Sequence, residues 1–208
     1  MNMWTEDLVL PEELRKERLQ KEPASYTAWI LGKSGKTQEK KRKAVIICPG
    51  GGYEHLSPRE GEPIAMKYLA MGCHVFVLHY SLAPERFPTA LRELALLTAK
   101  IREHADEWLI DPEGIIVSGF SAGGHLALSL GAHWDKEWLS GPLGLTPEQI
   151  RPNGLILCYP VVTAGKGCHR GSVERLLWGQ MLTEEEQMIP ERGTEEKEML
   201  RELISLEK

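Results

Sequence analysis

From residue 44 onward, apolar runs alternate along the chain with amphipathic stretches. Three short runs are apolar almost throughout, as is typical of strands covered on both faces: 44–48, 73–78 and 154–159. Between them, apolar residues recur at helical spacing over about 62–71 and again from 88 to about 105. This alternation predicts an α/β fold, with a mostly parallel sheet flanked by helices on both faces.

The two ends of the chain follow other patterns. Residues 1–25 are mostly polar, with a short helix predicted over 12–19, and we interpret them as an outer N-terminal segment. The main domain is expected to cover 26–208 and to begin with an edge strand at 26–31. Within it, residues 164–208 are polar and helical in pattern, which predicts a cap-like or connecting region.

One predicted strand leads into a Gly-x-Ser-x-Gly motif. A turn expected at Asp111–Gly114 precedes the β-branched run 115–118, and Gly119–Gly123 then leads into small and apolar residues that can start a helix. Such a strand, turn and helix form a nucleophile elbow, which presents its serine at the tip of a tight turn. Ser121 is therefore the candidate nucleophile, and the backbone N–H of Ala122 is a candidate oxyanion donor.

Three consecutive glycines, Gly50–Gly52, follow the first buried strand. The carboxyl ends of parallel strands meet at one edge of a sheet, so we expect these glycines to lie near Ser121. Glycine lets the backbone approach a substrate oxygen closely, which makes the N–H groups of Gly51 and Gly52 candidate oxyanion donors. The alternative is a merely flexible loop. In that case the entropic cost of three consecutive glycines would serve no function.

Composition narrows the class of protein. The 208 residues suit one domain, and a hydrophobic fraction of 42% with 26% charged residues is typical of a globular protein. The formal charge of −5 gives no reason to expect nucleic acid as a partner. The N-terminus lacks the basic and apolar regions of a signal peptide, and the longest apolar run, 155–162, is too short to span a membrane. We therefore expect a cytoplasmic protein with no membrane partner; the sequence does not indicate its oligomeric state.

Cysteine spacing agrees with a reducing compartment. The four cysteines form no C-x-x-C pair, so we expect reduced, mostly buried thiols: Cys48, Cys73, Cys158 and Cys168.

A second motif resembles the end of a phosphate-binding loop. Gly35-Lys36-Thr37 follows a predicted strand, but Ile30 stands where the first glycine of a Walker A motif belongs. The charged run 38–43 then leads into a strand, whereas a phosphate-binding loop needs a helix there. We interpret the segment as a solvated turn.

Several motifs in chain order resemble those of the esterase and lipase family of the α/β-hydrolase superfamily. They are Cys48–Tyr53, Ser57–Pro63, Leu78–Pro84, Gly119–Ala127, Tyr159–Val162 and His169–Ser172. Within that family they are most similar to small bacterial acetyl esterases and xylan-esterase-like proteins, from about residue 26 to the end.

The resemblance implies a carboxylic-ester hydrolase whose substrate is a small acyl ester, with acetylated sugars as one candidate class. It implies Ser121 as nucleophile, the loop at Gly51 and Gly52 in the role of the family's His-Gly-Gly-Gly motif, and no metal or organic cofactor. Pro49 stands where relatives carry the histidine of that motif. The oxyanion donors are backbone groups, so this departure leaves their role intact.

The general base is harder to assign. In this fold the catalytic acid and then the histidine follow the serine, each after a later strand. His125, one helical turn beyond Ser121, is expected to pack or cap, and His133 falls where no strand end would position it. For His169, the acids Asp135, Glu137 and Glu148 all precede the strand at 154–159, and no histidine follows Glu174.

We therefore expect the acid and the base to lie beyond residue 208, in a chain truncated at its C-terminus. Residues 203–208 resemble the family segment just before the strand that delivers the catalytic aspartate. A sheet without its last strands would leave an apolar edge uncovered, which predicts poor solubility or association. Three alternatives stay open: an internal triad through His169, a naturally short protein, and a non-catalytic ligand-binding relative.

Overall fold

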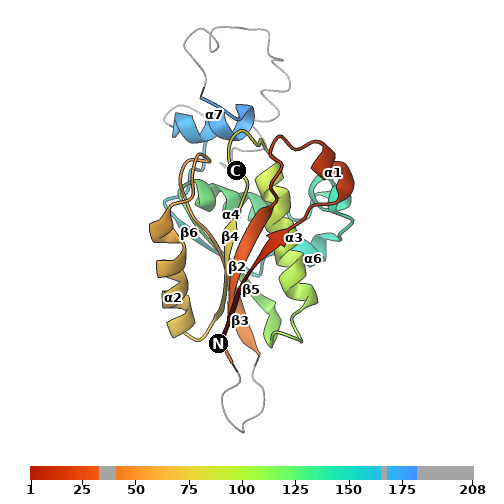
Figure 1. The fold of residues 1–208 in the computed structure, drawn as a ribbon, viewed down its shortest axis with the longest axis vertical. Helices are drawn as coiled ribbons and strands as arrows, with labels where there is room; N and C mark the ends of the chain where they lie inside the picture. The colour runs from red at the N-terminus through yellow and green to blue at the C-terminus, as the bar shows by residue number, and fades with distance from the viewer. Residues whose placement is uncertain (33–40, 165–167, 182–208) are drawn as a thin grey trace.

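A six-stranded, mostly parallel sheet runs through the centre of the protein (Figure 1). The computed structural model describes residues 1–32, 41–164 and 168–181. The strands, in the order β1-β2-β4-β3-β5-β6, are β1 (Asn2–Leu8), β2 (Ala24–Ile30), β4 (His74–His79), β3 (Arg42–Cys48), β5 (Ile110–Phe120) and β6 (Gly154–Cys158). The four strands from β4 to β6 pair in parallel, whereas β2 pairs antiparallel with both β1 and β4. The α/β architecture predicted from the hydrophobic pattern is confirmed.

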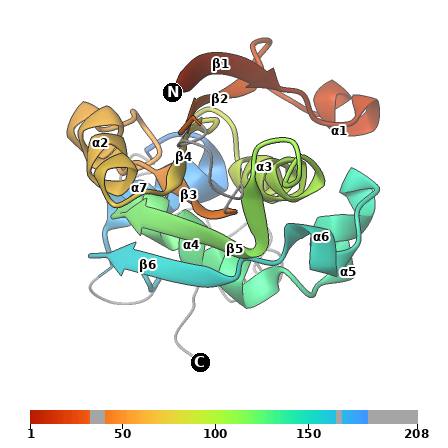
Figure 2. The ribbon, with the colours of Figure 1, turned by 90° about the horizontal axis from the view of Figure 1, so that it is seen from below.

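Helices cover both faces of this sheet (Figure 2). They are α1 (Glu12–Lys16), α2 (Glu62–Ala70), α3 (Thr89–Glu103), α4 (Ala122–His133), α5 (Glu137–Ser140), α6 (Pro147–Ile150) and α7 (Arg170–Trp178), with 3₁₀ turns at Pro58–Glu60 and Gly141–Leu143. The alternation of β3 shows why its residues from Ala44 to Cys48 are all apolar. Val45 and Ile47 pack on the side of α2, and Ala44 and Ile46 pack on the side of α3 and α4.

The first strand was not predicted. β1 pairs with β2 from Asn2 opposite Ile30 to Leu8 opposite Ala24, so the N-terminal segment forms one edge of the sheet. The alternation of β1 is obscured because Glu6 occupies an inward position, where it accepts a hydrogen bond of 2.6 Å from the Tyr26 hydroxyl and pairs with Lys100. The division of the chain at residue 25 stays a prediction.

The turn expected at Asp111–Gly114 lies inside β5, so this prediction is wrong about where the strand begins. Arg42 of β3 pairs with Ile110 and Ala44 pairs with Ile115, which leaves the residues between as a bulge. There the N–H of Glu113 donates to the Asp111 carboxylate at 3.1 Å. The turn chemistry was identified correctly, but the strand accommodates it without ending.

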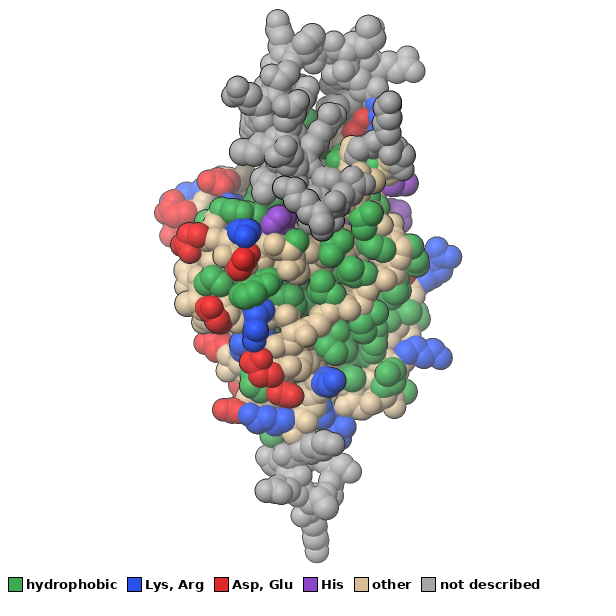
Figure 3. All heavy atoms as spheres, turned by 180° about the vertical axis from the view of Figure 1, so that it is seen from behind, with side chains coloured by type: hydrophobic (Ala, Val, Ile, Leu, Met, Phe, Trp, Pro, Cys, Tyr) green, Lys and Arg blue, Asp and Glu red, His purple; other side chains and the backbone are tan. Residues whose placement is uncertain are grey.

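The other edge of the sheet, within the described residues, is β6. Four of its five residues are only half-buried, and exposed apolar side chains lie on and just after it: Ile156, Tyr159 and Val162. Figure 3 shows apolar side chains gathered on the face opposite to that of Figure 1. The apolar edge expected from the sequence is present there, and the association it predicts stays a prediction.

Two further features concern the helices and the cysteines. Among the described residues, no helix has the length and apolar character needed to cross a bilayer. All four cysteines are free, but only Cys48 is buried and the other three are half-buried, so burial was expected too widely. The predicted turn at 32–37, apart from Gly32, and the segment 203–208 lie outside the described residues.

Candidate active site

Ser121 lies at the turn between β5 and α4, in a backbone conformation with φ 51° and ψ −116°. A positive φ is rare for a residue other than glycine and stores strain that the surroundings must hold. Here the Ser121 N–H donates to the Cys158 carbonyl at 3.0 Å, and the Ser121 carbonyl accepts from the N–H groups of His125 (3.0 Å) and Val161 (3.2 Å). The strand, strained turn and helix predicted for a nucleophile elbow are all present.

Two glycines let this turn close upon itself. A β-carbon on Gly119 would lie 2.6 Å from the carbonyl carbon of Gly123. A β-carbon on Gly123 would lie 2.6 Å from the carbonyl carbon of Cys48, and closer still to the carbonyl oxygens of Cys48 and Pro49. The motif therefore needs glycine at both positions, one for the turn itself and one for its contact with the end of β3.

The glycine loop lies against the elbow. β3 and β5 are neighbours, with Cys48 paired to Gly119, and a β-carbon on Gly50 would lie 3.0 Å from Cβ of Ser121. Gly51 and Gly52 follow with φ values of 130° and 66°, a region open to glycine and strained for other residues. Within the described part of the chain, their two N–H groups donate to no partner. The structure thus brings the two predicted motifs together and leaves the candidate donors available.

The carboxylate of Glu60, which was not predicted as a site residue, connects two loops at the carboxyl edge of the sheet. Glu60 accepts the N–H of Gly50 at 2.8 Å through one oxygen and the hydroxyl of Tyr159 at 2.6 Å through the other. Tyr159, directly after β6, has a φ of 38°. Glu60 thus links the residue before the candidate donors to the end of the strand beside the elbow. The only sequence signal was its place in the motif Ser57–Pro63.

We expect Glu60→Gln to lower the pKa of Tyr159, because it replaces the charged acceptor of the Tyr159 hydroxyl with a neutral one. The hydrogen bond to the Glu60 carboxylate raises the pKa of Tyr159 from 10.0 to about 12, because ionisation would place two negative charges side by side. In the variant this pKa falls toward 10, and one more tyrosine ionises below about pH 11 than in the wild type. The ultraviolet absorbance of tyrosinate during a pH titration measures the change. Glu62→Gln, an exposed neighbour in α2, is the control, and identical titrations of all three proteins would contradict the assigned contact.

Buried polar rings support the loop from below. The Tyr80 hydroxyl donates to the Pro49 carbonyl at 2.6 Å, and the Tyr53 hydroxyl lies 2.9 Å from Nδ1 of His125. Burial raises the pKa of both tyrosines well above the ordinary value. With 4% of its surface exposed, His125 is a packing residue, as the sequence analysis expected.

The other two histidines that follow Ser121 in the sequence also have structural partners. His133 ends α4 with its ring 5.5 Å from that of Trp138. His169 caps α7, where its Nδ1 lies 2.8 Å from the hydroxyl of Ser172, and Glu174 pairs with Arg170 at 2.5 Å. The expectation that the acid and base lie beyond residue 208 stays a prediction.

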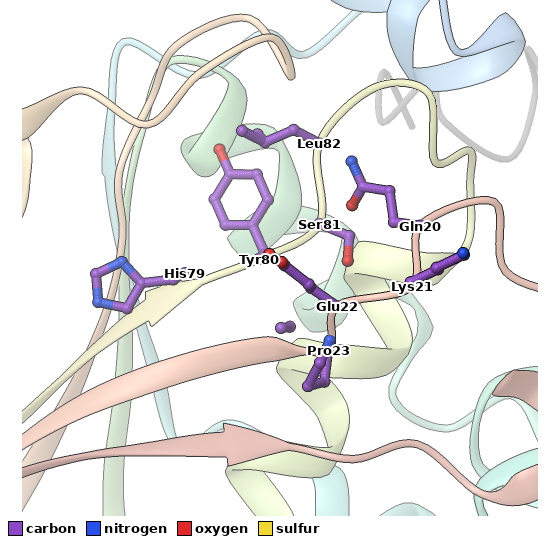
Figure 4. Close-up of a pocket in the computed structure, with 9 residues that line it drawn as sticks. Gln20, Lys21, Glu22, Pro23, His79, Tyr80, Ser81 and Leu82 are labelled. Atoms are coloured by element: carbon purple, nitrogen blue, oxygen red, sulfur yellow. The ribbon is translucent and has the colours of Figure 1, made fainter.

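Two cavities among the described residues lie apart from the elbow. One, of about 420 Å³, separates residues 20–24 from residues 79–82 (Figure 4), and a smaller one of about 270 Å³ lies between α1 and the start of α3. Neither is lined by Ser121 or by the glycine loop. Within the described ranges, no group of three His, Cys, Asp or Glu side chains is arranged to hold a metal ion.

The chain is similar to several known proteins. A family model described as alpha/beta hydrolase fold matches residues 45–193. Endo-1,4-beta-xylanase B of Butyrivibrio fibrisolvens is 35% identical over 150 residues, which cover 70% of this chain and 23% of that protein. The acetylxylan esterase of Xylanibacter ruminicola is 30% identical over 122 residues, covering 58% of this chain and 23% of that protein.

Solved structures similar to this chain include that of the acetyl ester-xyloside bifunctional hydrolase of Caldicellulosiruptor lactoaceticus, with 29% sequence identity and a TM-score of 0.72. This match covers 87% of the present chain and 65% of the other. The chain thus spans less than two thirds of each of these three relatives.

Proposed function

We propose, for a chain that belongs to the α/β-hydrolase fold family, that Ser121 is the nucleophile of a carboxylic-ester hydrolase. The observation that carries the proposal is the strained turn at Ser121, held against a glycine loop whose N–H groups have no partner among the described residues. A serine on such a turn at a strand end is the arrangement from which this fold performs acyl transfer.

In the proposed reaction, Oγ of Ser121 attacks the acyl carbon of the ester, and the carbonyl oxygen becomes an oxyanion. The N–H of Ala122, the first residue of α4, and those of Gly51 and Gly52 stabilise that charge, helped by the dipole of the twelve-residue helix. Each such donor is worth about 3 kcal/mol in the transition state. The alcohol leaves as the ester C–O bond breaks, and a water then releases the acyl group from Ser121. The base that takes the serine proton, returns it to the alcohol and activates that water is expected beyond residue 208.

The substrate we propose is a small acyl ester, with acetylated sugars as the first class to test. The support is that similar proteins carry the names acetylxylan esterase and acetyl ester-xyloside bifunctional hydrolase. The cytoplasmic location stays a prediction.

The direct test is covalent labelling of the serine. We expect a fluorophosphonate to form an adduct that mass spectrometry locates on Ser121, and we expect the full gene product to hydrolyse p-nitrophenyl acetate. Ser121→Ala should remove the adduct and lower kcat/KM by about a thousandfold or more. Ser129→Ala, in the same helix with a buried hydroxyl that has no hydrogen-bond partner among the described residues, is the matched control and should retain both.

Unchanged hydrolysis by the Ser121→Ala protein would refute the proposal. An ester that binds to the full gene product without labelling or turnover would favour the non-catalytic relative instead.

A further inference from the structure

Helix α7 lies directly over the glycine loop, beyond the carboxyl ends of the strands (Figure 1). A β-carbon on Gly52 would lie 3.4 Å from the hydroxyl oxygen of Ser172 and 4.0 Å from Nη1 of Arg175. Side chains from the first turns of α7 therefore border the candidate oxyanion donors, although more than a hundred residues separate them in sequence.

The helix is anchored independently of that loop. Leu176 and Leu177 are buried in the main core, and the Leu176 carbonyl accepts the N–H of Phe87 at 2.8 Å. At its end, Gly179 has a φ of 72°, and a β-carbon there would lie 3.0 Å from the carbonyl carbon of Pro84. Because α7 packs on the segment before α3, it can act as a fixed support for the loop.

An ion pair joins the loop to this support. Nη2 of Arg175 lies 2.8 Å from a carboxylate oxygen of Glu54, and the Arg175 side chain is only 18% exposed. The N–H of Glu54 donates to the Gly51 carbonyl at 3.1 Å, so Glu54 is attached to the loop through its backbone and to α7 through its side chain.

The loop needs such support because its conformation is unusual. Three successive residues, Gly51, Gly52 and Tyr53, have φ values of 130°, 66° and 59°. A chain with this geometry lies outside regular secondary structure, so its N–H directions depend on local contacts.

We propose that Arg175 is a positioning residue, which acts through Glu54 to keep the N–H groups of Gly51 and Gly52 directed at the site beside Ser121. This inference rests on the proposed function. Arg175 takes no part in bond making, and its pair with the mostly exposed Glu54 adds little to global stability. Its effect should therefore appear in loop order and turnover, because small misplacements of oxyanion donors are costly to the rate.

The first test measures loop order without relying on activity. In Arg175→Gln, we expect the amides of Glu54, His55 and Ser57, which bond to carbonyls of the loop, to exchange hydrogen about threefold to fivefold faster. Glu54→Gln should have the same effect, and the double variant should add nothing further. Arg151→Gln, which breaks a pair of similar length with Glu113, is the control and should leave these amides unchanged.

The second test measures turnover in the full gene product. We expect Arg175→Gln to lower kcat about tenfold with little change in KM, and the exchanged pair Arg175→Glu with Glu54→Arg to recover part of the loss. Wild-type exchange rates in Arg175→Gln would overturn the inference, as would faster exchange with unchanged kcat. Failure of the proposed function is distinguishable, since it appears as unchanged hydrolysis in Ser121→Ala and does not alter the exchange result.

Discussion

Alanine at Gly123 is expected to lower the free energy of unfolding by about 3 kcal/mol or more. The added β-carbon would lie 2.6 Å from the carbonyl carbon of Cys48 and closer to two carbonyl oxygens, all of them backbone atoms. Cys48 ends β3, which is paired on one side with β4 and on the other with β5. A backbone held on both sides cannot move away as the end of a flexible side chain could, so the overlap must be relieved by breaking the contact between elbow and sheet.

Urea unfolding followed by tryptophan fluorescence measures this effect. Gly154→Ala is the matched control, because its β-carbon would meet only the Ile116 side chain, at an ordinary 3.6 Å, and its φ is not positive. We expect the control to stay within about 1 kcal/mol of the wild type. A Gly123→Ala protein as stable as Gly154→Ala would mean that the elbow does not lie against β3 as described.

The elbow and the glycine loop could be predicted from sequence because each is a local pattern that directly follows an apolar run. Ser121 and Gly50 are brought together by a rule of topology, that parallel strands end at one edge, so the pattern was enough to place both. β1 was missed for the opposite reason, since Glu6 occupies an inward position and interrupts the alternation.

The contacts that hold the site together could not be predicted from the sequence, for a different reason. Glu60 contacts Tyr159 across 99 positions of the chain, and Arg175 contacts Glu54 across 121. The spacing of charged residues in the sequence does not predict such pairs. A single glutamate or arginine is expected to be a solvated surface side chain unless the fold places a partner beside it.

The partners of Arg18 could not be predicted from the sequence either. Its replacement by methionine is expected to destabilise the protein by about 3 to 5 kcal/mol near neutral pH. Its side chain is 6% exposed and lies 3.5 Å from Glu85 and 3.7 Å from Glu93, both buried acids. Arg18 also donates to the hydroxyl of Ser81 at 2.9 Å, and Ser81 in turn donates its N–H and hydroxyl to Glu93. Methionine keeps the length of the stem but leaves two buried carboxylates without their cation.

The loss of stability in Arg18→Met should depend on pH in a defined direction. Burial raises the pKa of Glu93 from 4.5 to about 7, opposed by Ser81 and Arg18. The folded protein therefore holds a proton on Glu93 that the unfolded chain releases, and the contribution of this group to stability falls as pH rises from 4.5 to 7. Without Arg18 the folded pKa rises further, so the decline becomes larger and extends to higher pH. The difference between Arg18→Met and the wild type should then be smaller at about pH 5 than at about pH 8.

Urea unfolding at these two pH values provides the measurement, with two companion variants to assign the cause. Lys16→Met removes a neighbouring but exposed cation, paired with Glu12 and Glu13 on the surface, and should change stability by less than about 1 kcal/mol at either pH. In a background of Glu93→Gln, the Arg18→Met substitution should lose most of its pH dependence, because the group that titrates is gone. If the loss persisted unchanged at both pH values in that background, its cause would be packing of the arginine stem, and the account of a buried cation between two acids would be wrong.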